Sequence, residues 1–244
     1  MKTATRTVAV FEAFAECRRP LTLTELAHAL RVPISSCFGL VRALENRGYL
    51  HSTNAQKALY PTRRMLQTAQ IISAHEPVVA RLTPQLARLR DKTRETVILG
   101  QMHASGSKVI YLDILEGPQT VRYTAGIGDL KPLHSSAIGK ALLATLPAAR
   151  LDALLKKLQL TRVTAQTLTT IDALKADLEA GRTRGYQMTR GENVADVAAI
   201  ALAVTVSGRT FGVAVAGPIH RMDAEIAHYA EALRATCRAL EGDG

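Results

Sequence analysis

The middle of the chain places a histidine, two serines and a lysine close together, as His134-Ser135-Ser136 followed by Lys140. A serine beside a lysine or a histidine can act as an activated nucleophile. Three features argue against catalysis: His134 is adjacent to Ser135, no Gly-x-Ser-x-Gly motif occurs, and a helix would normally place Lys140 in solvent. A hydrolase-like enzyme that uses Ser136, Lys140 and His134 is therefore the alternative function, and we expect no catalysis.

The same segment has the features of an anion-binding site. Gly126-Ile127-Gly128 permits a ligand to approach the backbone closely, since glycine has no side chain. Ser135 or Ser136 can cap a helix from Ala137 onwards, and the free N–H groups of a helix N-terminus attract a carboxylate. His134 can donate a hydrogen bond to the same anion. In the simpler interpretation, the serines only cap the helix and His134 only packs.

A second set of candidate residues belongs to a predicted pair of helices within residues 21–50. Thr22 and Glu25 have the three-residue spacing of a capping box at the start of the first helix. After a tight break, Pro33 can open the second helix, residues 33–46, because the first helical residue needs no partner for its N–H. The buried stripe of this second helix consists of Cys37, Leu40, Val41 and Leu44.

The opposite face of the second helix is small or polar, apart from one aromatic ring and one guanidinium. It carries Ser35, Ser36, Phe38, Gly39, Arg42 and Ala43. A helix fits the major groove of DNA, where hydroxyls, arginine and apolar atoms contact phosphates, guanine edges and thymine methyl groups. Residues 49–51 and 58–60 flank a polar loop, 52–57, and predict a wing with Lys57 near its tip. The sequence thus predicts a winged helix-turn-helix; an ordinary helical hairpin with a solvated face is the alternative.

The expected DNA contacts are of two kinds. Base or phosphate contacts are assigned to Ser35, Ser36, Phe38 and Arg42, and contacts to the DNA backbone to Thr22, Thr24, Lys57 and Arg63. The net charge of +10 supports them, because residues 1–75 hold ten of the 31 lysines and arginines but only four of the 21 acids. Such a basic segment favours a polyanion, since binding releases counterions from the duplex.

The remaining sequence indicates a second domain behind a connecting helix. Residues 62–74 predict a helix with few large apolar side chains, suited to joining two domains. Strands are predicted at residues 96–102, 109–114, 120–124, 198–206 and 210–216, and helices at 78–93, 137–145, 147–158, 171–180 and 223–240. We therefore expect an α+β chain with a mostly antiparallel sheet. Its expected parts are residues 1–61, a linker helix at 62–76, and residues 77–244.

Composition limits the class of protein. With 47% hydrophobic residues over 244 positions, the chain has material for a sizeable core and is not intrinsically disordered. No apolar run of about eighteen residues and no signal peptide occurs, so we expect a cytoplasmic protein with no membrane partner. Cys17, Cys37 and Cys237 match neither a disulfide framework nor a zinc spacing. We expect no metal and no cofactor.

Several strings together resemble the IclR family of bacterial transcription regulators. They are LTLTELAHALRVPISSCFGLVRALENRGYL (21–50), TRETVILG (93–100), GIGDLKPLHSSAIGKALLA (126–144), LTTIDALKADLEAGRTRGY (168–186) and AGPIHR (216–221). The resemblance covers most of the chain. It implies a winged helix-turn-helix that binds double-stranded operator DNA, a GAF-like C-terminal domain that binds a small-molecule effector, and a homodimer or homotetramer that represses or activates transcription.

The resemblance also implies where the effector binds. In the family, the effector pocket is lined by the segments that match Gly126, Ile127, Gly128, His134, Ser135, Ser136 and Ala137. Lining positions on the late strands are matched by Thr189, Ala199, Ala214 and Ala216. Small side chains at these positions leave room for an aromatic ring. The resemblance therefore favours interpreting the segment as a ligand site.

Two departures from the family pattern concern these sites. Many relatives have an arginine where this chain has Gly39, and we expect Arg42 to supply a substitute contact to DNA. The stretch Thr189-Arg190-Gly191-Glu192 has fewer acids than relatives have beside the effector pocket. With Arg190 nearby, we expect an anionic effector, such as an aromatic or small organic acid.

Overall fold

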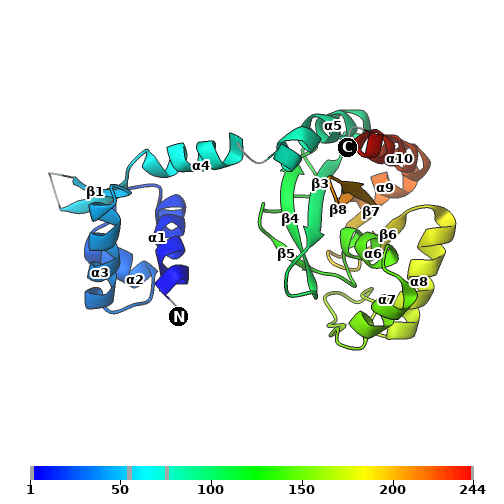
Figure 1. Ribbon diagram of the computed structural model, residues 1–244, viewed down its shortest axis with the longest axis horizontal. Helices are drawn as coiled ribbons and strands as arrows, with labels where there is room; N and C mark the ends of the chain where they lie inside the picture. Colours follow the sequence, from blue (N-terminus) through cyan, green and yellow to red (C-terminus); the bar gives the residue numbers. More distant parts are fainter. Residues whose placement is uncertain (1–2, 54–56, 75–76, 243–244) are drawn as a thin grey trace. The chain divides into compact units, whose positions relative to one another are not determined.

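The computed structural model describes residues 3–53, 57–74 and 77–242 (Figure 1). The chain divides into two compact units, Met1–Glu76 and Pro77–Gly244. Each unit has a hydrophobic core of its own.

The N-terminal unit contains helices and a two-stranded hairpin. Its elements are α1 (Thr3–Cys17), α2 (Leu23–Ala29), α3 (Ile34–Asn46), β1 (Leu50–Thr53), β2 (Ala58–Pro61) and α4 (Arg64–Ala74). The hairpin strands are antiparallel, with Leu50 opposite Pro61 and Thr53 opposite Ala58. The pair α2–α3 followed by this hairpin confirms the predicted winged helix-turn-helix. Part of the expected wing loop, residues 54–56, lies outside the described residues.

Local sequence signals set where α2 and α3 begin. Thr22 is the N-cap of α2: its hydroxyl accepts a hydrogen bond from the N–H of Glu25 (3.3 Å), and its own N–H donates to the Glu25 carboxylate (2.8 Å). The sequence predicts Pro33 as the first helical residue of α3, but in the structure Pro33 is the N-cap of this helix. The start of the helix is thus displaced by one residue, which is within the usual uncertainty of helix ends. Cys37 and Val41 then face the core of the unit.

The C-terminal unit is built on an antiparallel sheet with helices on both faces (Figure 1). Its strands are β3 (Thr96–Met102), β4 (Lys108–Leu115), β5 (Leu130–Pro132), β6 (Gln187–Arg190), β7 (Val197–Val206) and β8 (Arg209–Pro218), in the order β5-β4-β3-β8-β7-β6. Its helices are α5 (Pro77–Thr93), α6 (Ala137–Ala144), α7 (Ala148–Leu155), α8 (Ile171–Arg184), α9 (Ile219–Ala224) and α10 (Ile226–Gly242). Neighbouring strands all pair antiparallel, which confirms the predicted α+β class.

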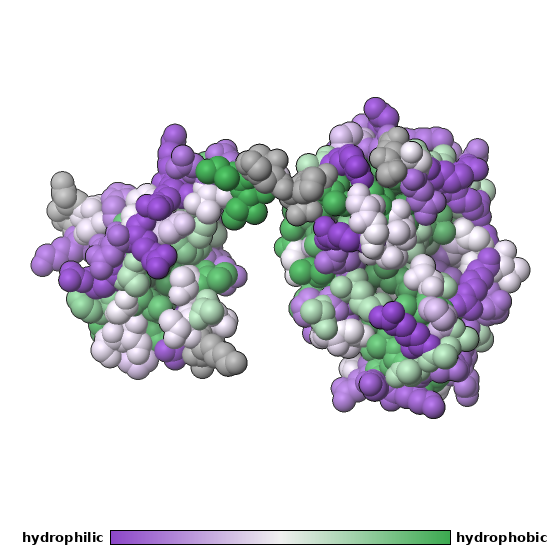
Figure 2. Space-filling model, in the orientation of Figure 1, coloured by the Kyte–Doolittle hydropathy of each residue, from purple (hydrophilic) through white to green (hydrophobic). Residues whose placement is uncertain are grey.

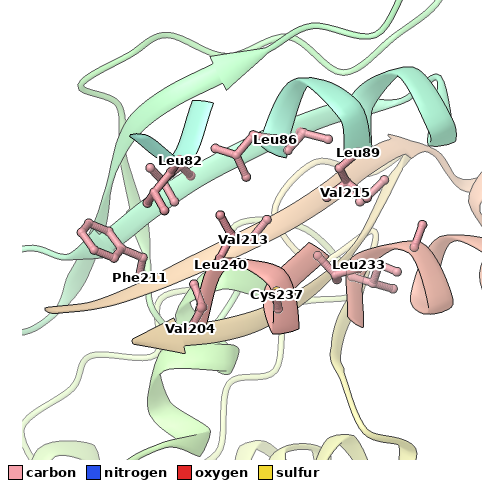
Figure 3. Close-up of a cluster of buried hydrophobic side chains, with 14 of the residues drawn as sticks. Leu82, Leu86, Leu89, Val204, Phe211, Val213, Val215, Leu233, Cys237 and Leu240 are labelled. Atoms are coloured by element: carbon pink, nitrogen blue, oxygen red, sulfur yellow. The ribbon is translucent and has the colours of Figure 1, made fainter. Parts of the chain in front are cut away.

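Helices bury both faces of the sheet, and successive side chains of a strand point alternately to one face and to the other. On one face, Val213 and Val215 of β8 pack with Leu86 of α5 and Leu233 of α10 (Figure 3). On the other face, Ala214 belongs to a second core that includes α6, α7 and α8. The alanine leaves more space under α6 than a valine would.

Two glycines allow α6 to lie close to the central strands. Gly100 of β3 pairs with Gly212 of β8, and a Cβ added at Gly212 would lie 2.5 Å from Cγ2 of Ile138 in the first turn of α6. A side chain there would push the helix away from the sheet. The close approach therefore fixes the N-terminus of α6 over the middle of the sheet.

Four elements differ from the sequence predictions. Residues 120–124 were expected to form a strand but have no regular secondary structure. Strands β5 and β6 were not predicted, because Leu-Lys-Pro and Gln-Met-Thr-Arg lack a β-branched, alternating pattern. The helix expected at 223–240 is interrupted at Glu225, whose φ of −115° lies outside the helical range.

Candidate DNA-binding helix and ligand cavity

The outer face of α3 carries the side chains predicted to contact DNA. Ser35, Phe38 and Arg42 are exposed and Ser36 is half-buried. Of the predicted buried stripe, three residues face the core and Leu40 is only half-buried; the three are Cys37, Val41 and Leu44. The guanidinium of Arg42 stacks over the ring of Phe38, with its central carbon 5.7 Å from the ring centroid. Such a stack holds the guanidinium in an extended position with its N–H donors free for an acceptor.

Gly39 follows Phe38 in the sequence and is exposed. A Cβ added there would meet nothing within 4 Å, so the backbone of α3 is open at this point. The surface of α3 is therefore open next to the Phe38–Arg42 stack.

The residues predicted to contact the DNA backbone lie outside α3, on other parts of the N-terminal unit. Thr24 is exposed in the first turn of α2, Arg63 is exposed just before α4, and Lys57 is exposed at the wing with φ of +50°. Thr22 differs from these, because its hydroxyl is engaged in the capping box with Glu25. Its availability for a phosphate is therefore reduced.

Replacing Thr22 with alanine should lower the free energy of unfolding by about 1 kcal/mol, because α2 loses its N-cap hydroxyl. Chemical denaturation measures this change. Thr24→Ala, in the same helical turn but exposed, is the matched control and should stay within about 0.5 kcal/mol of the wild type. Unchanged stability together with weaker DNA binding in the Thr22 variant would instead make Thr22 a DNA contact.

Hydrogen bonds from Arg19 and from the capping box lower the pKa of Glu25. A hydrogen bond from the Arg19 guanidinium, followed by those from Thr22, brings it to about 2, below the ordinary value of 4.5. A carboxyl whose pKa is lowered in the folded chain stabilises the fold above its unfolded pKa and stops doing so as the pH falls through the folded pKa. This contribution should therefore disappear only between about pH 4.5 and pH 2.

A cavity in the C-terminal unit lies between the N-terminus of α6 and the sheet. We name it the α6 cavity. It is lined by Ile98, Tyr111, Tyr123, Ser136, Ala137, Ile138, Thr189, Asn193, Val194, Val197, Ala199, Ala214 and Ala216. Its volume is about 30 Å³, which is enough for water but smaller than an aromatic ring.

The α6 cavity brings together six of the residues predicted to bind an effector. They are Ser136, Ala137, Thr189, Ala199, Ala214 and Ala216. The remaining five predicted residues, Gly126, Ile127, Gly128, His134 and Ser135, do not line it. Gly126–Gly128 belongs to a turn in which the N–H of Gly126 bonds to the carboxylate of Asp129 (3.2 Å) and Ile127 is exposed. The ring of His134 is directed to the carbonyl of Thr161, with Nε2 at 3.0 Å from it.

Two tyrosines that line the cavity were not identified from the sequence. Tyr111 belongs to β4, and Tyr123 belongs to the irregular segment expected as a strand. Burial, with a smaller effect from Tyr123, raises the pKa of the Tyr111 phenol, so it is a neutral hydrogen-bond donor. One feature of the sequence could have indicated that Tyr111 faces the interior: it lies two residues after Val109, and thus on the same face of the strand as this buried side chain.

Buried polar contacts hold the irregular segment that carries Tyr123. The hydroxyl of Thr96 donates to the carbonyl of Tyr123 at 2.6 Å, and Arg221 donates to the carbonyl of Val121 at 2.8 Å. Arg221 is itself paired with the buried carboxylate of Glu95 through Nε and Nη2. The Tyr123 wall of the α6 cavity is therefore positioned by side chains from β3 and α9.

The polar groups of the α6 cavity suit the recognition of a small polar ligand with an apolar body. Phenol, hydroxyl and amide groups come from Tyr111, Tyr123, Thr189 and Asn193, and apart from Ser136 the rest of the lining is apolar. Ser136 caps α6 by accepting from the N–H of Gly139 at 3.2 Å. Ala137 and Ile138 form the first turn of α6, where backbone N–H groups lack intrahelical acceptors.

The residues of the alternative enzyme are not arranged as a catalytic group. Ser136 Oγ donates to the carbonyl of Pro132 (2.7 Å), and the ring of His134 bonds to Thr161. Lys140 was expected in solvent but is fully buried, with Nζ at 2.7 Å from carboxylate oxygens of both Asp177 and Glu192. The prediction of a solvated lysine is wrong, because α8 and the segment after β6 cover this face of α6.

A winged helix-turn-helix unit followed by an α+β unit is an arrangement typical of a transcription regulator. Two family models match the chain: the IclR helix-turn-helix domain over residues 3–53 and the bacterial transcriptional regulator IclR C-terminal domain over residues 70–241. The chain therefore belongs to the IclR family of bacterial transcriptional regulators. This confirms the resemblance found in the sequence.

Individual relatives agree with this assignment. The HTH-type transcriptional regulator BhcR of Paracoccus denitrificans is 32% identical over 223 residues, which cover 90% of this chain and 79% of that protein. The crystal structure of Thermotoga maritima IclR matches with a TM-score of 0.83 at 22% identity, covering 99% of this chain and 98% of that one. An IclR homologue of Microbacterium hydrocarbonoxydans, crystallised with 4-hydroxybenzoate, matches with a TM-score of 0.76 at 23% identity, covering 99% and 98%.

Two further observations concern the described part of the chain. None of its helices combines the length and the apolar character needed to span a bilayer. Within the same residues, histidine, cysteine and acidic side chains do not gather into a group that could hold a metal ion.

Proposed function

We propose that this regulator binds an operator through α3 and that a small organic acid in the α6 cavity modulates this binding. The observation that carries the proposal is the α6 cavity, where a helix N-terminus and the neutral phenol of Tyr111 meet an alanine-lined sheet surface. Helix N–H groups and phenol hydroxyls are donors, and a carboxylate is an acceptor of several hydrogen bonds.

On the DNA side, Ser35, Phe38 and Arg42 are the proposed contacts in the major groove, with Ser36 beside them. Arg42 is suited to a guanine, and Phe38 to a thymine methyl group. Thr24, Lys57 and Arg63 are proposed to contact the DNA backbone, and Thr22 is proposed as the weakest of these contacts because it caps α2.

The proposed effector is an aromatic or small organic acid. Support comes from the lining, where Ala199, Ala214 and Ala216 leave space beside the sheet. Further support comes from the Microbacterium hydrocarbonoxydans homologue, which was crystallised with 4-hydroxybenzoate. An acid of this kind carries an apolar ring and a carboxylate, the two features that the cavity complements.

Binding of such an acid requires the cavity to widen, since its volume of about 30 Å³ does not hold a benzene ring. Asn193 and Val194 form the wall that can move, because they lie between β6 and β7 and Val194 is exposed. Glu192, next to them, contacts Lys140 in α6. An acid that prefers the widened cavity shifts the protein toward that state by its differential affinity, which is what allostery requires.

We further propose that the N-terminal unit pairs with a second copy of this chain. Large apolar side chains are exposed on α1 and α4, namely Val8, Leu66 and Ile72. Figure 2 shows hydrophobic surface over the C-terminal half of α4. Several large apolar side chains exposed in one unit are typical of a protein interface. A dimer, or a pair of dimers, would present two α3 helices to the half-sites of a pseudo-palindromic operator.

Isothermal titration calorimetry of the full chain tests the effector proposal. The panel contains benzoate, 4-hydroxybenzoate and small aliphatic acids, each beside its neutral amide. We expect saturable binding of at least one acid and at least tenfold weaker binding of its amide. Binding of neutral or cationic compounds alone would contradict the proposal.

Enlarging one alanine of the α6 cavity should block the effector. Ala199→Leu fills space that the acid needs, so its affinity should fall by about tenfold or more while DNA binding without acid is retained. Ala203→Leu is the matched control, because Ala203 lies four residues along β7 on the same face but outside the α6 cavity. An equal loss of acid affinity in both variants would contradict the location of the site.

A further inference from the structure

A second cavity lies next to the segment that connects β5 to α6. Its volume is about 300 Å³, and its polar lining includes Ser107, Lys108, His134, Lys157, Gln159 and Thr161. We name it the lysine cavity. The residues that line it include no carboxylate. Its electrostatic character is therefore positive, unlike that of the α6 cavity, whose lining carries no charged side chain.

The two lysines come from separate elements and face a common space. Lys108 is the first residue of β4, and Lys157 follows the C-terminus of α7. Neither forms an ion pair with a residue that the structure describes, whereas Lys131 pairs with Asp129 and Lys175 with Asp152. Two unpaired ammonium groups beside hydroxyl and amide donors are a suitable environment for a dianion.

His134 is the buried residue of the lysine cavity lining. The side chain is 1% exposed, and Nε2 lies 3.0 Å from the carbonyl of Thr161. A carbonyl can only accept, so Nε2 carries the proton and Nδ1 is an acceptor, which has no partner among the described residues. His134 thus ties residue 161, after α7, to the segment before α6, and both residues line the lysine cavity together with the two lysines.

We propose that the lysine cavity is a second ligand site, for a small phosphate-bearing anion. A phosphate group carries close to two negative charges at neutral pH and three acceptor oxygens. Lys108 and Lys157 supply the opposing charges, and Ser107, Gln159 and Thr161 supply neutral donors. The volume of about 300 Å³ exceeds that of inorganic phosphate, so a small organic phosphate fits as well.

The lysine cavity and the α6 cavity share one short segment, residues 132–136. Pro132 lines the lysine cavity, and its carbonyl accepts from the hydroxyl of Ser136, which lines the α6 cavity and caps α6. The N–H of Leu133, in the same segment, donates to the carbonyl of Ser107 at 3.3 Å. An anion that draws Lys108 and Lys157 together therefore acts on the start of α6. This second step, a change in effector affinity, rests on the proposed function of the α6 cavity.

Calorimetry of the full chain in a phosphate-free buffer, with inorganic phosphate and with glycerol 3-phosphate as probes, tests the site. We expect saturable binding of at least one probe, weakened about tenfold or more by Lys157→Gln and by Lys108→Gln. Lys156→Gln is the matched control, because Lys156 precedes Lys157 but does not line the cavity, and it should bind as the wild type does. No binding to the wild type, or equal binding by all four proteins, would overturn the proposal.

The coupling between the lysine cavity and the α6 cavity is tested by measuring acid affinity with and without the phosphate probe. The affinity for an organic acid that binds the α6 cavity should change at least threefold when the phosphate probe is saturating, and this change should vanish in Lys157→Gln. An unchanged affinity would overturn the coupling and leave the phosphate site in place. Phosphate binding without binding of any acid would contradict the proposed function of the α6 cavity and would not contradict the lysine cavity.

Discussion

Replacing Lys140 with methionine should lower the free energy of unfolding by about 3–5 kcal/mol. Lys140 is fully buried, and its Nζ bonds to carboxylates of Asp177 and Glu192, which are 29% and 10% exposed. Methionine has a similar volume but no charge, so the variant keeps the packing and leaves two carboxylates without their cation. Chemical denaturation of the two proteins measures the loss.

An exposed ion pair provides the matched control. Lys175 contacts Asp152 with side chains that are 43% and 48% exposed, so Lys175→Met should cost no more than about 1 kcal/mol.

The loss of stability in the Lys140 variant should also depend on pH. Burial raises the pKa of Glu192 above its ordinary 4.5, and Lys140 opposes this rise. A raised folded pKa costs stability as the pH rises through it, so the loss should be larger at about pH 8 than at about pH 5. Equal small losses in both lysine variants would contradict a structural role for Lys140.

Replacing Arg42 with alanine should weaken operator binding by about 1–3 kcal/mol, or roughly 5- to 150-fold. Arg42 is exposed on α3 and is held over Phe38, so its donors are directed away from the core. If Arg42 contacts a guanine, the loss should be large on the operator and small on an operator with that base pair changed. Titration of each DNA by fluorescence anisotropy measures this difference.

Gly39 offers a rescue of the Arg42 variant. A side chain at this position meets nothing within 4 Å, so Gly39→Arg should fold normally and place a guanidinium one turn from the lost one. The double variant Gly39→Arg, Arg42→Ala should therefore recover part of the operator affinity. Equal weakening by Arg42→Ala on every DNA sequence, with no recovery, would make Arg42 a phosphate contact and contradict its role in reading a base.

The fold could be predicted from the sequence where local signals are strong. The capping box of Thr22 and Glu25 marks the start of α2, and two apolar hairpins predict the central strands β3, β4, β7 and β8. Short edge strands gave no such signal, because β5 and β6 contain few β-branched residues and each pairs with a single neighbour. The segment with Tyr123 has a strand-like composition, but hydrogen bonds from Thr96 and Arg221 hold its backbone in an irregular path.

The site was harder to predict because it depends on packing between distant segments. The resemblance identified small residues of β7 and β8 that do line the α6 cavity, such as Ala199 and Ala214. It also grouped His134 with them, although His134 faces the lysine cavity on another side of the same segment. Adjacent residues that enter a helix point in different directions, so sequence proximity to Ser136 does not place two side chains in one cavity. The burial of Lys140 likewise depends on α8, which no local pattern reveals.

We propose that this regulator reads a specific DNA sequence under the control of an organic acid. Fluorescence anisotropy tests it most directly, with the intergenic DNA upstream of the gene for this protein and its divergent neighbour, against a scrambled duplex at physiological salt. The panel of organic acids is added to each. We expect tight binding to the native fragment alone, shifted by at least one acid through the α6 cavity. Equal, salt-sensitive binding to both duplexes that no acid alters would contradict the claim.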